Sequence, residues 1–308
     1  RSLDALEAVD PGLRAEGALV GSVALSSARH PTLDAQVRAL ETLRTELSAL
    51  PEVVAVGGIT NLPFEGPGYT GWHILRSDPE PAPGDEPTGG VEMVSSGYFA
   101  AQGVALLAGR TFDAREAEEG RAVTVVNGTM ARLRWPSRSP VGDFVRFGPT
   151  GISPWFEVVG VVDDVRYDLA RPARPRFYVP ERRSFGPLSL RTTVVRLGGD
   201  AAAAAPAVRA AFARALPDAP LVRLEPMSDV AAEALATARL QALLLSLFGM
   251  VGTGLGAVGV YGMVSFQVGR RTREVGLRMA LGATRTRVVA RVVSGILAPV
   301  GMGLAAGA

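Results

Sequence analysis

The amino-acid sequence predicts an α+β domain, made of two βαβ units with an inserted strand-rich subdomain, followed by transmembrane α-helices. Three observations lead to this fold class. Residues 12–238 alternate apolar and polar stretches with the periods of short strands and amphipathic helices. The order strand, helix, strand occurs twice, once near each end of that region. After Arg239 the chain has 30 uncharged residues, and about 20 apolar residues suffice to cross a bilayer.

The first βαβ unit lies near the start of the chain. Residues 17–27, GALVGSVALSS, and residues 53–59, VVAVGGI, each predict a strand. Between them, residues 32–50 predict an amphipathic helix that ends at Pro51, because proline has no backbone donor. The apolar side chains of this helix recur at helical spacing: Leu33, Val37, Leu40, Leu43, Leu47 and Leu50.

The second unit repeats this order. Strands are predicted at 190–197 and 219–225, with a helix at 201–216 between them. Both helices end in the same Leu-Pro-acid pattern, at Leu50-Pro51-Glu52 and Leu216-Pro217-Asp218. The two units form a weak internal repeat, and we expect them to pack together at the base of the inserted subdomain.

The inserted subdomain is predicted at 91–187, after a segment rich in Pro and Gly, 63–90, that we expect to be a loop. A short helix is predicted around Tyr98–Gln102, and a strand followed by a helix at 122–135. The remaining strands form a predicted hairpin, at 144–148 and 155–165.

The histidines of the predicted domain, residues 12–238, do not suggest a metal site. His30 and His73 each occur without the spacing of paired ligands, and we expect them at the surface or in loops. We find no nucleophile elbow, phosphate loop or calcium loop in the sequence. We therefore predict no catalytic residue, no metal site and no cofactor.

Two polar patterns favour structural roles. Asp163 and Asp164 follow a predicted strand, and we expect them in a solvated turn because adjacent side chains point apart. Asn127-Gly128-Thr129 matches a glycosylation acceptor, but its place between a strand and a helix favours a helix cap.

Residues 240–269 predict a membrane helix. Thirty helical residues extend roughly 45 Å, so the helix either tilts or continues beyond the bilayer. The run contains Gly254-x-Gly256-x-x-Gly259, which spells a dinucleotide fingerprint but lacks the preceding strand and turn. We interpret the small residues as a helix-packing face made of Gly249, Gly252, Gly256 and Gly259. The alternative is a buried helix of a soluble domain.

The charge of the chain is unevenly distributed. All 32 basic residues are Arg, and residues 270–291 hold seven of them with a single acid, Glu274. Short basic loops mark the cytoplasmic side of a membrane, so we place 270–291 in the cytoplasm and 12–238 outside it. The uncharged run 292–308, with Pro299, predicts the start of another span. Because the basic residues are confined to one segment beside apolar runs, nucleic-acid binding is not predicted.

The motifs carry a family resemblance. Residues 258–284, VGVYGMVSFQVGRRTREVGLRMALGAT, resemble the second membrane helix and cytoplasmic turn of MacB/FtsX-type ABC transporter permeases. Residues 95–112, SSGYFAAQGVALLAGRTF, are similar to a recurring motif of the family's periplasmic core domain, and 125–148 and 156–180 continue in the family's order. The sequence pattern of the last segment, ARPARP followed by YVP, most resembles that of the large permeases with duplicated halves found in acidobacteria and their relatives. Residues 1–11 resemble the exit from a first membrane helix, so we expect a fragment of a longer chain.

The resemblance implies a multi-pass protein of the bacterial inner membrane, with residues 239–308 as a truncated FtsX-like permease domain. It implies that ATP hydrolysis by a separate ATPase rearranges the extracytoplasmic domain, for export or mechanotransmission, and that this chain is not itself an enzyme. The cytoplasmic turn would be a coupling helix on the ATPase, formed by Arg271, Arg273, Glu274, Val275, Gly276, Leu277, Arg278, Leu281 and Gly282. The expected partners are that ATPase, the lipid bilayer and a second protomer or permease half.

Two other readings remain open at this point. The chain could be a membrane-anchored extracytoplasmic binding or sensor module without an ATPase, whose arginines contact only lipid headgroups. It could also be a membrane-tethered enzyme, which would need clustered titratable groups in a pocket. Nothing in residues 12–238 selects a substrate.

Overall fold

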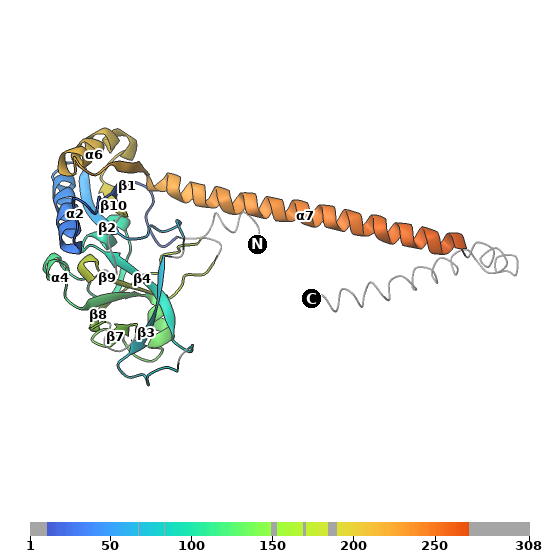
Figure 1. The fold of residues 1–308 in the computed structure, drawn as a ribbon, viewed down its shortest axis with the longest axis horizontal. Helices are drawn as coiled ribbons and strands as arrows, with labels where there is room; N and C mark the ends of the chain where they lie inside the picture. The colour runs from blue at the N-terminus through green and yellow to red at the C-terminus, as the bar shows by residue number, and fades with distance from the viewer. Residues whose placement is uncertain are drawn as a thin grey trace. The chain divides into compact units, whose positions relative to one another are not determined.

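Figure 1 shows the computed structural model of the chain, which describes residues 11–66, 68–82, 84–148, 153–168, 171–183 and 190–270. Two compact units are present, Arg1–Arg239 and Leu240–Ala308. The first, which we call the core domain, contains all the strands in the described ranges. Helix α7 (Met227–Arg270) begins in the core domain and provides the described part of the second unit.

Both predicted βαβ units are confirmed. The first consists of β1 (Ala18–Ala24), α2 (Leu33–Ser48) and β2 (Val53–Ile59), and the second of β10 (Leu190–Leu197), α6 (Ala201–Ala215) and β11 (Leu221–Pro226). Their strands lie in the order β11-β1-β10-β2, and all neighbours are antiparallel. The strands of each unit therefore flank one strand of the other, so neither unit has a complete sheet by itself.

Helices α2 and α6 cover one face of these four strands, and together they form what we call the βαβ layer (Figure 1). Side chains alternate along the strands, so that Leu19 and Val195 pack against the helices while Ala18 and Val194 face the other way. The predicted apolar stripe of α2 is buried at Val37, Leu40, Leu43 and Leu47. The central strands β1 and β10 are thus buried on both faces.

The inserted region contains a closed ring of strands, which we call the barrel. Its strands are β3 (Tyr69–Leu75), β4 (Thr88–Val94), β6 (Val123–Asn127), β7 (Phe144–Phe147), β8 (Trp155–Val162) and β9 (Arg176–Pro180). They pair in the order β4-β3-β7-β8-β6-β9, and the ring closes because β9 also pairs with β4. One apolar cluster joins all six strands, as expected for a small barrel filled by side chains.

Shorter elements complete the core domain: α3 (Tyr98–Gln102), β5 (Leu106–Gly109), α4 (Ala114–Glu119), α5 (Gly128–Arg134) and the 3₁₀ helix η1 (Glu181–Arg183). The predicted short helix, the strand–helix pair and the antiparallel hairpin strands are confirmed. Strands β4, β5 and β9, helix α4 and η1 were not predicted. Helix α4 carries a local signal, a capping box between Asp113 and Glu116.

The prediction of a loop over 63–90 is wrong. This segment contains all of β3 and the start of β4, because β3 pairs with β4 on one side and with β7 on the other. His73 lies on β3 and is 1% exposed, so its predicted surface position is also wrong. Its ring packs edge-on against Phe177, 4.8 Å between ring centroids. His30 lies in a loop, as expected.

Helix α7 contains one stretch long and apolar enough to cross a membrane, Leu243–Met263, with a mean hydropathy of 1.9. It falls within the predicted membrane helix, 240–269. Large apolar side chains along it are exposed, including Leu245, Phe248 and Tyr261. This helix fits insertion into a membrane. The predicted cytoplasmic segment after Arg270 and the predicted second span lie outside the described residues.

Candidate functional site

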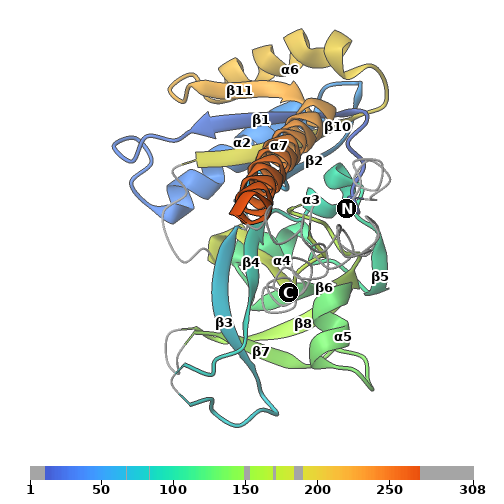
Figure 2. The same ribbon diagram turned by 90° about the vertical axis from the view of Figure 1, so that its right-hand side faces the viewer.

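The βαβ layer and the barrel meet at a joint where α3 lies between them (Figure 2). A single bridge, between Ile59 and Val94, pairs β2 with β4. Beside it, helix α3 packs directly on β2, and a β-carbon on Gly97 would lie 2.1 Å from the carbonyl oxygen of Val56. Only glycine allows two backbones to approach this closely. The joint is therefore formed by backbone contact as well as by side chains.

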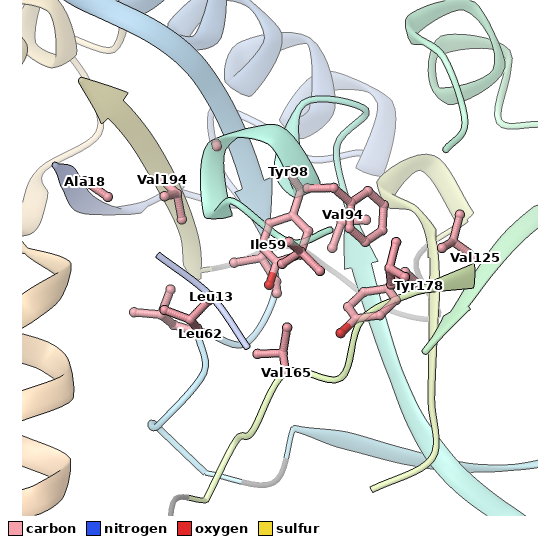
Figure 3. Close-up of a cluster of buried hydrophobic side chains, with 14 of the residues drawn as sticks. Leu13, Ala18, Ile59, Leu62, Val94, Tyr98, Val125, Val165, Tyr178 and Val194 are labelled. Atoms are coloured by element: carbon pink, nitrogen blue, oxygen red, sulfur yellow. The ribbon is translucent and has the colours of Figure 1, made fainter. Parts of the chain in front are cut away.

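Apolar side chains from both parts meet in what we call the joint cluster (Figure 3). Tyr98 enters it from α3 and Tyr178 from β9, with ring centroids 6.1 Å apart. Its buried members are Leu13, Ala18, Val20, Ile59, Leu62, Val94, Tyr98, Phe99, Ala101, Val104, Phe112, Val123, Val125, Val159, Val162, Val165, Tyr167, Tyr178, Val194, Met227 and Val230. Because interiors are close-packed, a shift on one side of this cluster is felt on the other.

Helix α7 begins inside the joint cluster. Strand β11 ends at Pro226 and α7 starts at the next residue, so no loop separates them. Met227 is 0% exposed and Val230 is 5% exposed, and both belong to the cluster. They are three residues apart, so they lie on one face of the helix. The first turn of α7 is thus anchored among the side chains that join the layer to the barrel.

A buried ion pair lies beside the cluster. Glu92 of β4 and Arg176 of β9 are 0% and 3% exposed and contact each other. Asn61, which follows β2, donates a hydrogen bond of 3.0 Å to Glu92, and the Arg176 guanidinium lies 3.5 Å from the ring centroid of Tyr167. Burial raises the pKa of Glu92 to about 7, although Arg176 and Asn61 favour its charged form. The pair and Asn61 connect the barrel to the end of a layer strand.

A second set of ion pairs crosses the joint. Arg44 of α2 pairs with Glu181 of η1, and both side chains are largely buried. Arg182 of η1 pairs with Asp34 and Glu41 of α2. Since η1 directly follows β9, these contacts hold a helix of the layer against the end of a barrel strand.

Sequence reasoning did not identify these residues. The usable signal was a single charge within an apolar strand: Glu92 stands between Val91 and Met93, and Arg176 precedes Phe177. Such a residue is buried only with a partner, but nothing in the sequence says which partner.

Asp164 does not lie in a solvated turn, so this expectation is wrong. Its carboxylate accepts hydrogen bonds from the Thr129 amide and the Thr129 hydroxyl, both 2.8 Å, and from Arg132, 2.7 Å. Asp163 is exposed, as expected. Asp164 therefore holds the first turn of α5 from 35 residues away, a contact that no local pattern indicates.

Asn127 caps α5, as expected. Its side-chain oxygen accepts from the amides of Met130, 3.0 Å, and Arg176, 2.9 Å, and its side-chain nitrogen donates to the Arg174 carbonyl, 2.9 Å. The side chain is 1% exposed. The glycosylation motif is therefore a structural element in the folded chain.

The part of the chain that the structure describes holds no group of three or more His, Asp or Glu side chains arranged to bind a metal ion. A polar surface groove lies between α2, α4 and η1, lined by Leu33, Asp34, Glu118, Glu119, Gly120, Arg182 and Arg183. Neither finding points to a reaction. The features that stand out are structural: the joint between the layer and the barrel, and the first turn of α7.

A family model described as MacB-like periplasmic core domain matches residues 9–218, which is more than half of the chain. The chain belongs to the MacB-like periplasmic core domain family. The match to the family model ends before β11. The joint cluster therefore combines residues of the family domain with residues of the first turn of α7.

Curated relatives of this MacB-like chain are exporters. It is 28% identical over 204 residues to the probable syringafactin export ATP-binding/permease protein SyfD of Pseudomonas syringae pv. tomato, covering 63% of this chain and 30% of the relative. It is 26% identical over 206 residues to the macrolide export ATP-binding/permease protein MacB of Burkholderia cenocepacia, covering 65% and 30%. The chain thus spans about 30% of the length of these relatives.

A comparison with solved structures matches the periplasmic region of MacB from Actinobacillus actinomycetemcomitans. The TM-score is 0.48 at 14% identity, covering 75% of this chain and 97% of that chain. The extracellular domain of the ABC-type transporter YknZ from Gram-positive bacteria gives a TM-score of 0.43 at 18% identity, covering 65% and 93%.

The sequence-predicted site residues of this MacB-like chain fall into two groups. The nine predicted coupling residues, Arg271 to Gly282, lie outside the described residues. Gly249, Gly252, Gly256 and Gly259 lie on α7, and beyond the helix's own neighbouring backbone no described atom comes within 4 Å of a β-carbon placed on any of them. Both the coupling role and the packing face stay predictions.

Proposed function

We propose that this chain is the permease part of a MacB/FtsX-type ABC transporter, in which α7 carries movement from an ATPase to the extracytoplasmic core domain. The observation that supports this most is the continuity of α7. One unbroken helix has its first turn buried in the joint cluster and carries the apolar stretch Leu243–Met263 farther along.

The stiffness of that helix is the physical argument. Residues 227–242 precede the apolar stretch, and at 1.5 Å per residue they extend about 24 Å. A helix without a break transmits axial displacement or rotation, whereas a loop between strand and helix would absorb it. Since α7 starts directly after β11, its motion acts on the layer and on the joint cluster together.

The ATPase is proposed as a partner because the names of the relatives pair an ATP-binding part with a permease part. In this proposal residues 270–291 lie in the cytoplasm. The turn Arg271–Gly282 lies on the ATPase, with Glu274 and a neighbouring Arg in contact. Hydrolysis occurs in the partner, and this chain supplies the mechanical connection to an export or mechanotransmission step.

The test is co-purification of the full-length parent chain with its candidate ATPase, together with the ATPase rate. Glu274→Lys is compared with wild type and with Glu118→Lys, a charge reversal at an exposed position of α4. We expect Glu274→Lys to lose association and stimulated hydrolysis with unchanged membrane insertion, while Glu118→Lys keeps both. Full association of the Glu274→Lys protein with the ATPase would contradict the coupling role of Glu274. Failure of the wild-type protein to associate with the ATPase would favour the anchored binding module.

A further inference from the structure

Residues 11–16 cross the joint from the barrel to the layer. The carbonyl of Pro11 accepts a hydrogen bond of 3.0 Å from the Arg166 amide, just beyond β8. The Arg14 amide donates to the carbonyl of Gln102 at the end of α3, 3.0 Å, and residue Gly17 accepts from the Leu197 amide of β10, 2.8 Å. The segment therefore contacts the end of a barrel strand, helix α3 and the layer in turn.

We infer that residues 11–16 form a strap, by which we mean a segment that holds the barrel against the layer and can detach. We infer also that the hydrogen bonds of Arg196 keep this strap in place. The Arg196 guanidinium, projecting from β10, donates to three carbonyls. These are Ala101 at 2.9 Å, Glu16 at 2.6 Å and Arg14 at 2.6 Å. The planar fork of Arg suits several fixed acceptors at once, which a Lys ammonium on a flexible stem does not match.

The strap buries little side-chain surface. Leu13 is buried, at 8% exposure, Ala15 is partly buried against the joint cluster, and Gly12 lies close to the backbone of Asp164, whereas Arg14 and Glu16 are exposed. Segments with few buried contacts open at lower free energy than core strands. Leu13 belongs to the same joint cluster as Met227 and Val230, so a shift of the α7 root reaches the strap. The inference rests on contacts within the core domain and does not depend on the proposed function.

The experiment uses the full chain in lipid nanodiscs, with two readouts. The first is hydrogen–deuterium exchange of residues 11–17. The second is the distance distribution between spin labels on Leu133→Cys of α5 and Ala213→Cys of α6, both at exposed positions. The chain has no other Cys, so labelling is specific. Arg196→Gln is compared with Arg209→Gln, which removes an exposed Arg of α6.

We expect Arg196→Gln to speed exchange of the strap by about tenfold or more, since bonds from a charged donor are each worth about that factor. We also expect a broader label distance distribution, while Arg209→Gln changes neither. An unchanged exchange rate of residues 11–17 would show that Arg196 does not hold the strap in place. Faster exchange with an unchanged distance distribution would show that the strap does not tie the barrel to the layer. If Arg196→Gln does not fold, Arg196→Lys, which keeps the charge without the fork, decides by the same two readouts.

Discussion

The backbone of Gly57 in β2 lies against the backbone of Tyr98 in α3, so closely that a β-carbon on Gly57 would be 2.3 Å from the Cα of Tyr98. This contact brings helix α3 onto the layer and places the Tyr98 ring in the joint cluster. A flexible side chain could move away from an added methyl group, but the backbone of a short helix anchored by Tyr98 and Phe99 has little freedom to do so.

We therefore predict that Gly57→Ala destabilises the core domain by about 1–3 kcal/mol, the range for overpacking a close-packed site. Gly71→Ala on β3 is the matched control. Its β-carbon would meet only the Val91 side chain at 3.6 Å, an ordinary contact. Urea unfolding followed by tryptophan fluorescence measures the difference. Equal stability of the two variants would mean that α3 can shift away from β2.

Removal of the Asp164 carboxylate should weaken the start of α5. Asp164→Ala leaves the half-buried Thr129 amide without its acceptor. A fully buried donor left unpaired costs about 1–3 kcal/mol, so we expect a loss of about 1 kcal/mol, at the lower end of that range. Asp163→Ala removes a neighbouring exposed carboxylate and is expected to stay within about 0.5 kcal/mol of wild type. The free energy of unfolding, measured for both variants by the same method, decides. A larger loss of unfolding free energy for Asp163→Ala than for Asp164→Ala would show that Asp164 is not the residue that stabilises the start of α5.

His73 should make the core domain less stable in acid. Burial, with the nearby Arg134 charge, lowers the pKa of His73 from 6.5 to about 4. Between those values the unfolded chain binds a proton that the folded chain does not. The contribution is thus fully present above pH 6.5 and is lost as pH falls through 4, by roughly 3 kcal/mol at most.

The measurement is the free energy of unfolding of wild type and His73→Phe at several pH values from 7 to 4. Trp72, Trp135 and Trp155 lie in or next to barrel elements, so their fluorescence reports the region around His73. We expect the two proteins to differ in the slope of stability against pH, with a flatter profile for His73→Phe. Parallel profiles would show that His73 does not titrate in this window.

The glycine face of α7 should lie at a helix–helix contact in the membrane. Single Cys residues at Gly252, Gly256 or Gly259 are expected to form disulfides between chains, or with a second permease half, under mild oxidation. Tyr261→Cys is the control, because it lies about 140–180° around the helix from Gly252, Gly256 and Gly259. Gel analysis of oxidised native membranes measures the cross-links. Cross-linking through position 261 in preference to the glycines would place the contact on another face.

Much of the secondary structure could be predicted because its signals are local. The alternation in GALVGSVALSS, the apolar spacing from Leu33 to Leu47 and the cap at Asn127 each act within a few residues. The apolar run in α7 is equally local, since length and lack of charge suffice to suggest a membrane helix. Strand β3 was not predicted because its Pro- and Gly-rich surroundings suggest a loop. In the fold, its pairing with β4 and β7 stabilises it as a strand.

The sequence by itself determined the two βαβ units, the apolar helix and the family motifs, because periodicity and composition decide local structure and burial. Only the tertiary structure decided that the units interleave, that six inserted strands close into a ring, and that Glu92 meets Arg176 across 84 residues. It also placed the root of α7 and Leu13 in one cluster. These are pairings between segments that are distant in the chain. A single sequence indicates which residues need a contact when buried, but not which distant residue provides it.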